Sequence, residues 1–306
     1  MMEEELYEEL ENCSLCPRNC GVNRNRGAVG YCGETAVLRA ARAYLHMWEE
    51  PCISGSRGSG TVFFTGCSLK CIFCQNAPLA EGQTGKEISA KRLAEIFLEQ
   101  QERGAHNINL VTPTHFLPQI VRALEQAKNM GLGIPVVYNT GGYEKAESIR
   151  SLQGLVDIYL PDFKYWSPEL AKRYSEAPDY PKWAMEALAE MYRQVGPPVF
   201  EEKDGLMKKG IIVRHLLLPG QTEDSKKIVG YLYETYGDNI FVSLMNQYTP
   251  MPGVEELCPE LGRRVTRREY DRLVDYAIDI GLSNGFIQEG RTAEESFIPL
   301  WNLEGI

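Results

Sequence analysis

Three cysteines stand close together in the segment GCSLKCIFCQN, at positions 67, 71 and 74. Their CxxxCxxC spacing directly follows TVFFTG (61–66), which reads as a strand because it is rich in β-branched and aromatic residues. Three thiolates on a compact loop can bind three irons of a cubane and leave the fourth iron without a protein ligand. A structural zinc ion would need a fourth ligand, and no Cys or His follows nearby. We therefore predict that Cys67, Cys71 and Cys74 hold a 4Fe–4S cluster with one open iron.

Four more cysteines lie near the start of the chain, in CSLCPRNC and then GYCG. Clustered cysteines in a chain without an export signal more often bind metal than form disulfides. Four thiolates so close together can enclose a metal completely, and such ligand sets select zinc or an iron–sulfur cluster. The sequence thus predicts a second metal centre, either structural zinc or a second 4Fe–4S cluster, with the ligands Cys13, Cys16, Cys20 and Cys32.

From residue 61 onwards, short β-rich runs alternate with amphipathic stretches. We expect strands at 61–66, 106–111, 134–139, 155–160, 210–218 and 239–245, and helices at 89–104, 116–131, 167–194, 222–236 and 266–280. This alternation predicts parallel strands with right-handed crossovers, and therefore an α/β fold with a full or partial β/α barrel. We expect a cysteine-rich lobe at 1–50, a barrel core with a C-terminal extension at 51–306, and an exposed excursion at 195–209.

Polar motifs follow four of the expected strands directly. They are GCSLKC, TPTH, NTGGY and PDFK, in chain order. In a β/α barrel the chemistry lies at the carboxyl ends of the strands. The sequence therefore places a functional site at this end of the barrel.

Charge and hydropathy exclude several other classes of protein. The formal net charge is −10 at pH 7, which argues against a nucleic-acid partner held by phosphate contacts. No run of about 18 apolar residues is present, so we expect no membrane span. The acidic start MMEEELYEELENC is unlike a secretory signal peptide. We expect a cytoplasmic protein.

The cysteine segment, the strand before it and the downstream β/α series resemble the radical S-adenosylmethionine (SAM) superfamily. Within it the chain is similar to the PflX-like group, usually labelled pyruvate formate-lyase activating enzyme-like. The resemblance covers nearly the whole chain and is carried by CSLCPRNCGVNRNRGAVGYCG, WEEPCISGSRGSGTVFFTGCSLKCIFCQN, NINLVTPTHF and NGFIQE. It implies that SAM binds the open iron. One electron then yields methionine and a 5′-deoxyadenosyl radical that abstracts hydrogen from a substrate.

The resemblance also implies residues that bind SAM. Phe73, the aromatic residue before the last cysteine, belongs to the superfamily pattern. Where relatives carry a GGE-like motif for the amino group of SAM, this chain has Thr112-Pro113-Thr114, without a carboxylate. Hydroxyls and backbone carbonyls would then bind the amino group. The alternative is an ordinary strand-end turn.

Glycyl-radical activases supply the remaining correspondences. Asn139 and Thr140 match an Asp-Thr pair, and Asn139 removes one anionic ligand for the monovalent cation held there in activases. Asp162 and Lys164 match an Asp-x-Lys element, and Arg214 matches an arginine that reaches the cofactor. Lys164 and Arg214 suit a carboxylate partner, although an ion pair with Asp162 alone would also explain them. Near the sixth strand, SLMNQYTP offers Asn246 and Gln247 as contacts of adenine or ribose.

Three functions follow from these motifs. The first is an activase-like enzyme that abstracts hydrogen from a protein, such as a glycyl radical enzyme. The second is a radical SAM enzyme that acts on a small molecule or short peptide. The third is a non-catalytic iron–sulfur electron carrier, which the long β/α series disfavours. For either enzyme we expect an anaerobic oxidoreductase that receives one electron from a flavodoxin- or ferredoxin-like donor.

Overall fold

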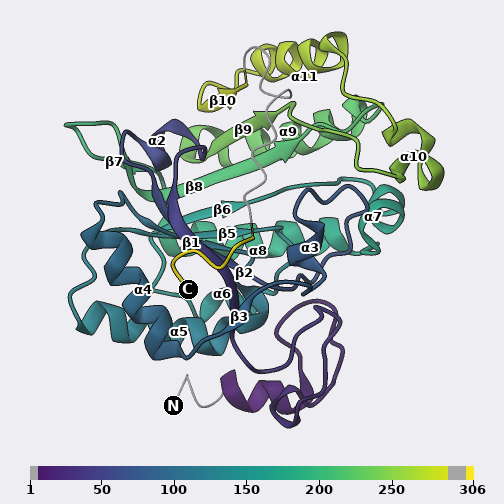
Figure 1. The fold of residues 1–306 in the computed structure, drawn as a ribbon. Helices are drawn as coiled ribbons and strands as arrows, with labels where there is room; N and C mark the ends of the chain where they lie inside the picture. Colours follow the sequence, from purple (N-terminus) through teal and green to yellow (C-terminus); the bar gives the residue numbers. More distant parts are fainter. Residues whose placement is uncertain (1–5, 289–300) are drawn as a thin grey trace.

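The computed structural model describes residues 6–288 and 301–306 of the chain (Figure 1). Its centre is a ten-stranded sheet in the order β10-β9-β8-β6-β5-β4-β2-β1-β3, with β7 paired to β8. The strands are β1 (Arg39–His46), β2 (Ser59–Phe64), β3 (Lys86–Glu87), β4 (Ile108–Val111), β5 (Val136–Thr140), β6 (Ile158–Pro161), β7 (Val199–Phe200), β8 (Met207–Leu216), β9 (Phe241–Met245) and β10 (Gly285–Ile287).

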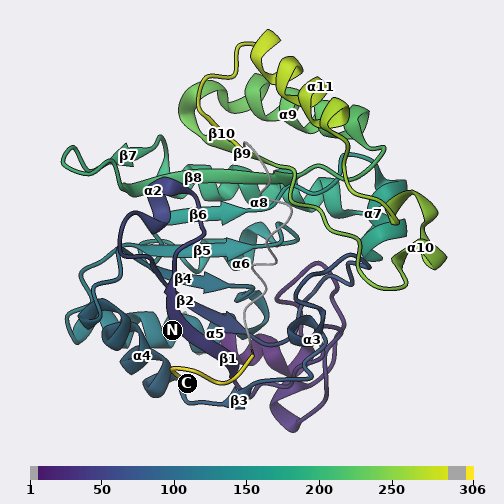
Figure 2. The ribbon, with the colours of Figure 1, turned by 45° about the horizontal axis from the view of Figure 1, so that its top comes forward.

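Helices pack along the outer face of this sheet, as Figures 1 and 2 show. The α-helices of the described residues are α2 (Pro51–Ser54), α3 (Ala77–Ala80), α4 (Ala90–Glu102), α5 (Leu117–Asn129), α6 (Ala146–Arg150), α7 (Pro168–Ser175), α8 (Tyr180–Val195), α9 (Thr222–Tyr236), α10 (Val254–Leu257) and α11 (Arg267–Asp279). Short 3₁₀ helices are η1 (Glu9–Asn12), η2 (Arg24–Arg26), η3 (Thr114–Phe116), η4 (Gly237–Asn239) and η5 (Pro259–Leu261). The apolar stripe of α4, including Leu93 and Phe97, is fully buried, as helical periodicity predicts.

The six expected strands all form, within three residues of the predicted starts and ends, and they pair in parallel from β2 to β9. β10 extends the parallel set beyond β9, whereas β1 and β3 add antiparallel strands at the other edge. No described strand joins the two edges, so the sheet is a partial barrel. The α/β fold with a partial radical SAM-type barrel is confirmed.

Two expectations at the domain level stay predictions. Residues 39–46 pair with β2 over their whole length, so part of the predicted 1–50 lobe contributes a strand to the sheet. The predicted C-terminal extension falls partly on residues 289–300, which lie outside the described residues.

The region 167–209 differs in detail from its expectation. The single helix expected at 167–194 is two helices, because Glu176 adopts a left-handed conformation (φ 52°) and ends α7. Within the predicted excursion, β7 forms a short hairpin with the start of β8. This hairpin lies at the amino end of β8, away from the carboxyl ends of the parallel strands (Figure 2). It therefore cannot close the mouth of the predicted site.

All helices in the described ranges are either too short or too polar to traverse a lipid bilayer.

Candidate functional site

The three central cysteines lie on the loop that leaves the carboxyl end of β2. Two hydrogen-bond donors point at their sulfurs: the Leu69 N–H lies 3.4 Å from Cys67 Sγ, and the Ser175 hydroxyl lies 2.9 Å from Cys71 Sγ. Such donors are typical of the surroundings of cluster-bound thiolates. The loop therefore fits the three-cysteine cluster that the sequence predicts.

The thiols also influence one another electrostatically. Burial, together with the charge of Cys71, raises the pKa of Cys67 to about 11. Burial and the charges of Cys71 and Cys67 raise the pKa of Cys74 to about 12. In the described part of the chain, no three Cys, His, Asp or Glu side chains are already arranged around a single-ion site. A cubane binds each thiolate through a different iron, so its ligands need not converge on one point.

A half-buried charge cluster lies on and beside the neighbouring strands. Arg214 donates to Asp162 (3.1 Å), to Glu49 (3.1 Å) and to the Asn139 side-chain oxygen (2.6 Å). Lys164 forms a second ion pair with Asp162, 2.6 Å long. Burial opposes ionisation of Asp162, but the charges of Lys164 and Arg214 lower its pKa below the usual value. Asp162 therefore stays ionised and pairs with both cations, but its single negative charge balances only one of the two positive charges.

Glu49 is a member of this cluster that sequence reasoning missed. It comes from the segment between β1 and α2, ninety positions before Asn139, and its carboxylate accepts from Asn109 (2.9 Å) and Asn139 (3.4 Å). Its neighbour Glu50 is buried, and Glu50 Oε2 has no hydrogen-bond partner among the described residues. No local motif marks these acids, because their partners lie on distant strands.

Two adjoining cavities flank the charge cluster. One, of about 690 Å³, is lined by Gln75 and Asn76 from the cysteine loop and by Asn139 and Arg214 from the sheet. The other, of about 830 Å³, contains Glu50; both cavities share the boundary residues Trp48, Glu49, Arg214 and Gln247. Both volumes include space that is open to solvent, so the two cavities are open clefts at the surface. The first cavity joins the cysteine loop to the predicted SAM-binding residues Asn139 and Arg214.

The predicted threonines form a second polar group. Thr112 adopts a left-handed conformation (φ 57°), which is uncommon for a β-branched residue and is often found at functional sites. Thr114 donates to Glu144 (2.5 Å), and the Thr140 hydroxyl donates to the same carboxylate oxygen. Glu144 is thus a carboxylate beside the TPT motif that sequence reasoning missed. Its position four residues after Thr140, in NTGGYE, was the available signal.

Glu144 is fully buried and its second oxygen has no partner among the described residues. Burial raises the pKa of Glu144 to about 7, and the two threonine hydroxyls partly counter this effect. The carboxyl group can therefore carry either charge state near neutral pH.

The remaining predicted SAM contacts are Phe73 in the cysteine loop and Asn246 and Gln247 directly after β9. Phe73 is buried and packs edge-to-face against Tyr248, with ring centroids 6.1 Å apart. Asn246 is half-buried, and its backbone N–H donates to the Gln288 side chain at 3.0 Å. Its neighbour Gln247 lines both cavities. The structure thus brings the charge cluster and the threonine group to the carboxyl edge, and neither Phe73 nor Asn246 is among the residues that line the two cavities.

Residues 61–232 match the Radical SAM superfamily domain. The chain belongs to this superfamily. Radical SAM proteins are enzymes that use a 4Fe–4S cluster and SAM, and this membership carries both cofactors to the chain. A similar protein is uncharacterized protein MJ0674 of Methanocaldococcus jannaschii, with 29% identity over 279 residues, 88% of this chain and 75% of that one.

Two solved structures share the radical SAM fold. Streptococcus suis SuiB bound to the precursor peptide SuiA has a TM-score of 0.51 and 16% identity, covering 74% of this chain and 48% of SuiB. HydG, a maturase of the [FeFe]-hydrogenase, has a TM-score of 0.50 and 14% identity, covering 78% of this chain and 53% of HydG. The chain spans about half the length of both, so the likeness concerns the fold.

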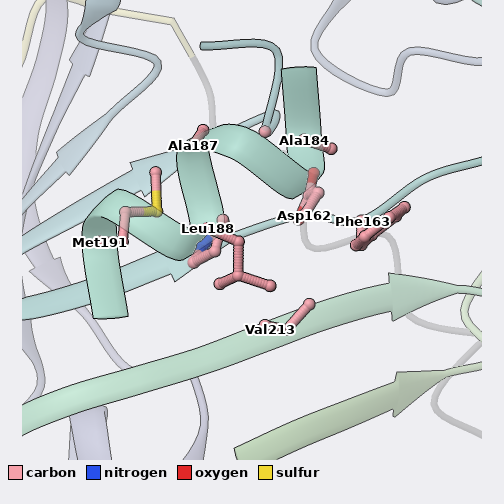
Figure 3. Close-up of a pocket in the computed structure, with 9 residues that line it drawn as sticks. Asp162, Phe163, Ala184, Ala187, Leu188, Met191 and Val213 are labelled. Atoms are coloured by element: carbon pink, nitrogen blue, oxygen red, sulfur yellow. The ribbon is translucent and has the colours of Figure 1, made fainter. Parts of the chain in front are cut away.

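A third, smaller pocket of the radical SAM domain lies behind the sheet, between α8 and strands β6 and β8 (Figure 3). Its walls are mainly apolar side chains such as Leu188, Met191 and Val213. This pocket has a volume of about 200 Å³ and lies on the helix side of Asp162. It is therefore a packing void in the core, separate from the candidate site.

The four amino-terminal cysteines lie beside the radical SAM loop. The Cys67 N–H donates to the Cys32 carbonyl at 3.1 Å, which joins the lobe to the first cluster cysteine. Arg18 donates to the carbonyls of Ser68 (2.8 Å), Ser175 (3.1 Å) and Glu176. The lobe is therefore attached to both segments that contact the predicted cluster.

Proposed function

We propose that this radical SAM enzyme binds SAM in the 690 Å³ cavity and abstracts hydrogen from a substrate at the same edge of the sheet. The observation that carries the proposal is the position of this cavity, between the cysteine loop (Gln75 and Asn76) and the cluster around Arg214. When bound, the cluster and SAM supply a 5′-deoxyadenosyl radical. The residues of the chain hold and orient the cofactors and keep water away from them.

Each side of the cavity has a distinct role in this proposal. Cys67, Cys71 and Cys74 hold the cluster, and the donors at Leu69 and Ser175 stabilise its thiolates. Lys164 and Arg214 attract the SAM carboxylate, because charge-assisted hydrogen bonds are among the strongest that a protein can offer. Asp162 holds both cations in place.

Glu144 takes the part of the carboxylate that the TPT motif lacks. Its free oxygen would accept from the SAM ammonium group, while Thr114 and Thr140 fix its other oxygen. A positive ligand would favour the ionised form of a carboxyl group whose pKa lies near 7. Thr112 and Asn139 line the adjoining strand ends, where their backbone groups pair at 2.9 Å.

The test is SAM cleavage by anaerobically reconstituted protein under a chemical reductant. We expect methionine and 5′-deoxyadenosine to accumulate, and a Cys71→Ala variant to form neither product. Cys52→Ser is the matched control, because Cys52 is a buried cysteine outside both clusters. Product formation by the Cys71→Ala variant at the wild-type rate would refute the proposal.

For the substrate we propose an activase-like reaction on a protein, as in the PflX-like group, with a flavodoxin- or ferredoxin-like electron donor. The open edges of the sheet and the distant position of the β7 hairpin support access by a polypeptide segment. Reduced, SAM-loaded enzyme should generate a glycyl radical signal by electron paramagnetic resonance when mixed with its partner. A partner that stays diamagnetic while SAM is consumed would contradict this assignment.

The cavity around Glu50 favours a second candidate, a small molecule or short peptide. A buried carboxylate oxygen without a partner is costly, and a ligand with a donor group would satisfy it. Deuterium transfer from a labelled small substrate into 5′-deoxyadenosine would support this candidate. Its absence together with a protein radical would support the activase-like reaction.

A further inference from the structure

The amino-terminal lobe brings its four cysteines into one region through backbone turns, while no three of these described thiols yet surround a single point as ligands of one ion would. The Cys13 N–H donates to the Val22 carbonyl (3.0 Å), and the Gly21 N–H returns to the Cys13 carbonyl (3.1 Å). This pair of bonds places Cys13 beside the end of the CSLCPRNC segment. Gly21 has a φ of 66°, which allows the chain to turn there.

Gly30 keeps space open beside two of the sulfurs. A Cβ at this position would lie 3.2 Å from Cys32 Sγ and 3.6 Å from Cys20 Sγ. The sulfurs of Cys20 and Cys32, which are twelve positions apart in the sequence, therefore lie on either side of the space left by Gly30. Cys13, Cys16 and Cys32 are buried, and Cys20 is half-buried.

A buried cation lies beside these cysteines, and no carboxylate of residues 6–288 or 301–306 pairs with it. Arg24 is only 1% exposed, and its Nη1 lies 3.8 Å from Cys13 Sγ. Its other hydrogen bonds go to the carbonyls of His115 (2.7 Å) and Thr35 (2.6 Å), and its Nε has no partner. No described Asp or Glu forms an ion pair with it. A buried guanidinium without a counter-charge strongly destabilises the folded state.

We propose that Cys13, Cys16, Cys20 and Cys32 bind a metal as a closed tetrathiolate centre, zinc or 4Fe–4S, whose negative charge is balanced by Arg24. Metal binding deprotonates all four thiols and leaves a net anionic centre beside the guanidinium. The positive charge of Arg24 is unfavourable beside neutral thiols, but it stabilises an anionic metal centre.

This centre would also position the radical SAM loop. Cys32 carries the carbonyl that accepts from Cys67, and Arg18, two residues after Cys16, holds the Ser68 and Ser175 carbonyls. A metal that fixes Cys16 and Cys32 therefore fixes both attachments.

The metal content of this centre can be measured separately from that of the central cluster in full-length protein that lacks the central cysteines. Cys67→Ala, Cys71→Ala and Cys74→Ala together should leave about one zinc or about four irons per chain after anaerobic purification. Adding Cys16→Ser and Cys20→Ser should remove that metal, whereas adding Cys52→Ser and Cys258→Ser should not. Zinc and iron distinguish the two forms of the centre, and both support the proposal. Only trace metal in a folded triple variant would overturn it.

A second measurement tests the counter-charge and does not depend on the radical reaction. Arg24→Met should weaken metal retention against a chelator by roughly 10- to 100-fold, the usual effect of losing a residue that supports metal ligands. Arg24→Lys should recover part of the loss. Arg26→Met on the same 3₁₀ helix is the control, because Arg26 is exposed. If Arg24→Met retains the metal as wild type does and raises the thermal stability, the thiols are neutral and the proposal fails.

Discussion

The Ser175 hydroxyl lies 2.9 Å from Cys71 Sγ, although the two residues are 104 positions apart. Ser175 is fully buried at the end of α7, and its hydroxyl also pairs with Tyr165 at 2.6 Å. Its carbonyl accepts from Arg18 of the lobe. One residue thus connects the crossover helix, the lobe and a cluster cysteine, which makes it a sensitive position for the electronic properties of the cluster.

Ser175→Ala should make the cluster harder to reduce. Hydrogen bonds to cluster sulfurs raise the reduction potential, and a bond worth about 1 kcal/mol corresponds to a shift on the order of tens of millivolts. Potentiometric titration followed by electron paramagnetic resonance measures the midpoint. Ser151→Ala removes another buried hydroxyl that contacts no cysteine, and its midpoint should equal that of wild type. A Ser175→Ala midpoint at or above the wild-type value would count against the proposed donor.

Lys164→Ala should weaken SAM binding by roughly 10- to 100-fold and leave the iron content unchanged. Loss of a hydrogen bond to a charged group costs about 1.5–3 kcal/mol, and Asp162 keeps Arg214 as its partner. Anaerobic equilibrium dialysis measures the affinity. Lys208→Ala is the control, because its ion pair with Glu201 is on the β7 hairpin. Equal affinities for wild type, Lys164→Ala and Arg214→Ala would assign these cations to the ion pairs alone.

Glu144→Gln should weaken SAM binding and remove a pH dependence of stability. The pKa of Glu144 in the folded protein, about 7, lies above the ordinary glutamate value of 4.5, so the wild type loses stability as the pH rises across this interval. The loss is complete above about pH 7 and amounts to roughly 3 kcal/mol at most. Urea unfolding at pH 5 and pH 8 should show Glu144→Gln to be the more stable protein only at pH 8. The exposed Glu147→Gln change should show neither effect, and a SAM affinity unaltered by Glu144→Gln would exclude the proposed ammonium contact.

Gly142→Ala should destabilise the site more than a glycine replacement with the same backbone angle elsewhere. Gly142 and Gly154 both have a φ of 80°, but a Cβ at 142 would lie 2.1 Å from the Asp162 carbonyl oxygen, whereas at 154 it meets nothing within 4 Å. Gly154→Ala should therefore cost only the backbone penalty of about 1–2 kcal/mol. Gly142→Ala should cost about 1–3 kcal/mol more and also reduce SAM affinity. Similar urea midpoints for the two variants would show that the close approach is absent in solution.

The strands and the cysteine loop could be predicted because their signals are local. The β-rich run at 61–66 and the CxxxCxxC spacing are contiguous in the sequence, and β2 and its loop form there. The ion pair between Asp162 and Arg214 could also be predicted, because Asp162 directly follows one strong strand pattern and Arg214 lies within another.

Glu49 could not be predicted, since nothing near WEEP indicates that its carboxylate reaches β4, β5 and β8. Such contacts depend on the curvature of the whole sheet. Glu144 could not be predicted for a different reason. In related proteins the carboxylate belongs to the motif at the TPT position, whereas here it comes from the connection between β5 and α6.

The segment from Trp48 to Glu50 precedes the β/α series in the chain and yet forms a wall shared by both cavities. Trp48 itself is 64% exposed, so its side chain contributes little to the folded core. Variation at this one position could therefore change the shape available to a substrate while leaving the cysteine loop and the Arg214 cluster intact. A small library at Trp48 offers a practical route to altered substrate range, because acceptance of new compounds can be selected there without first repairing cofactor assembly.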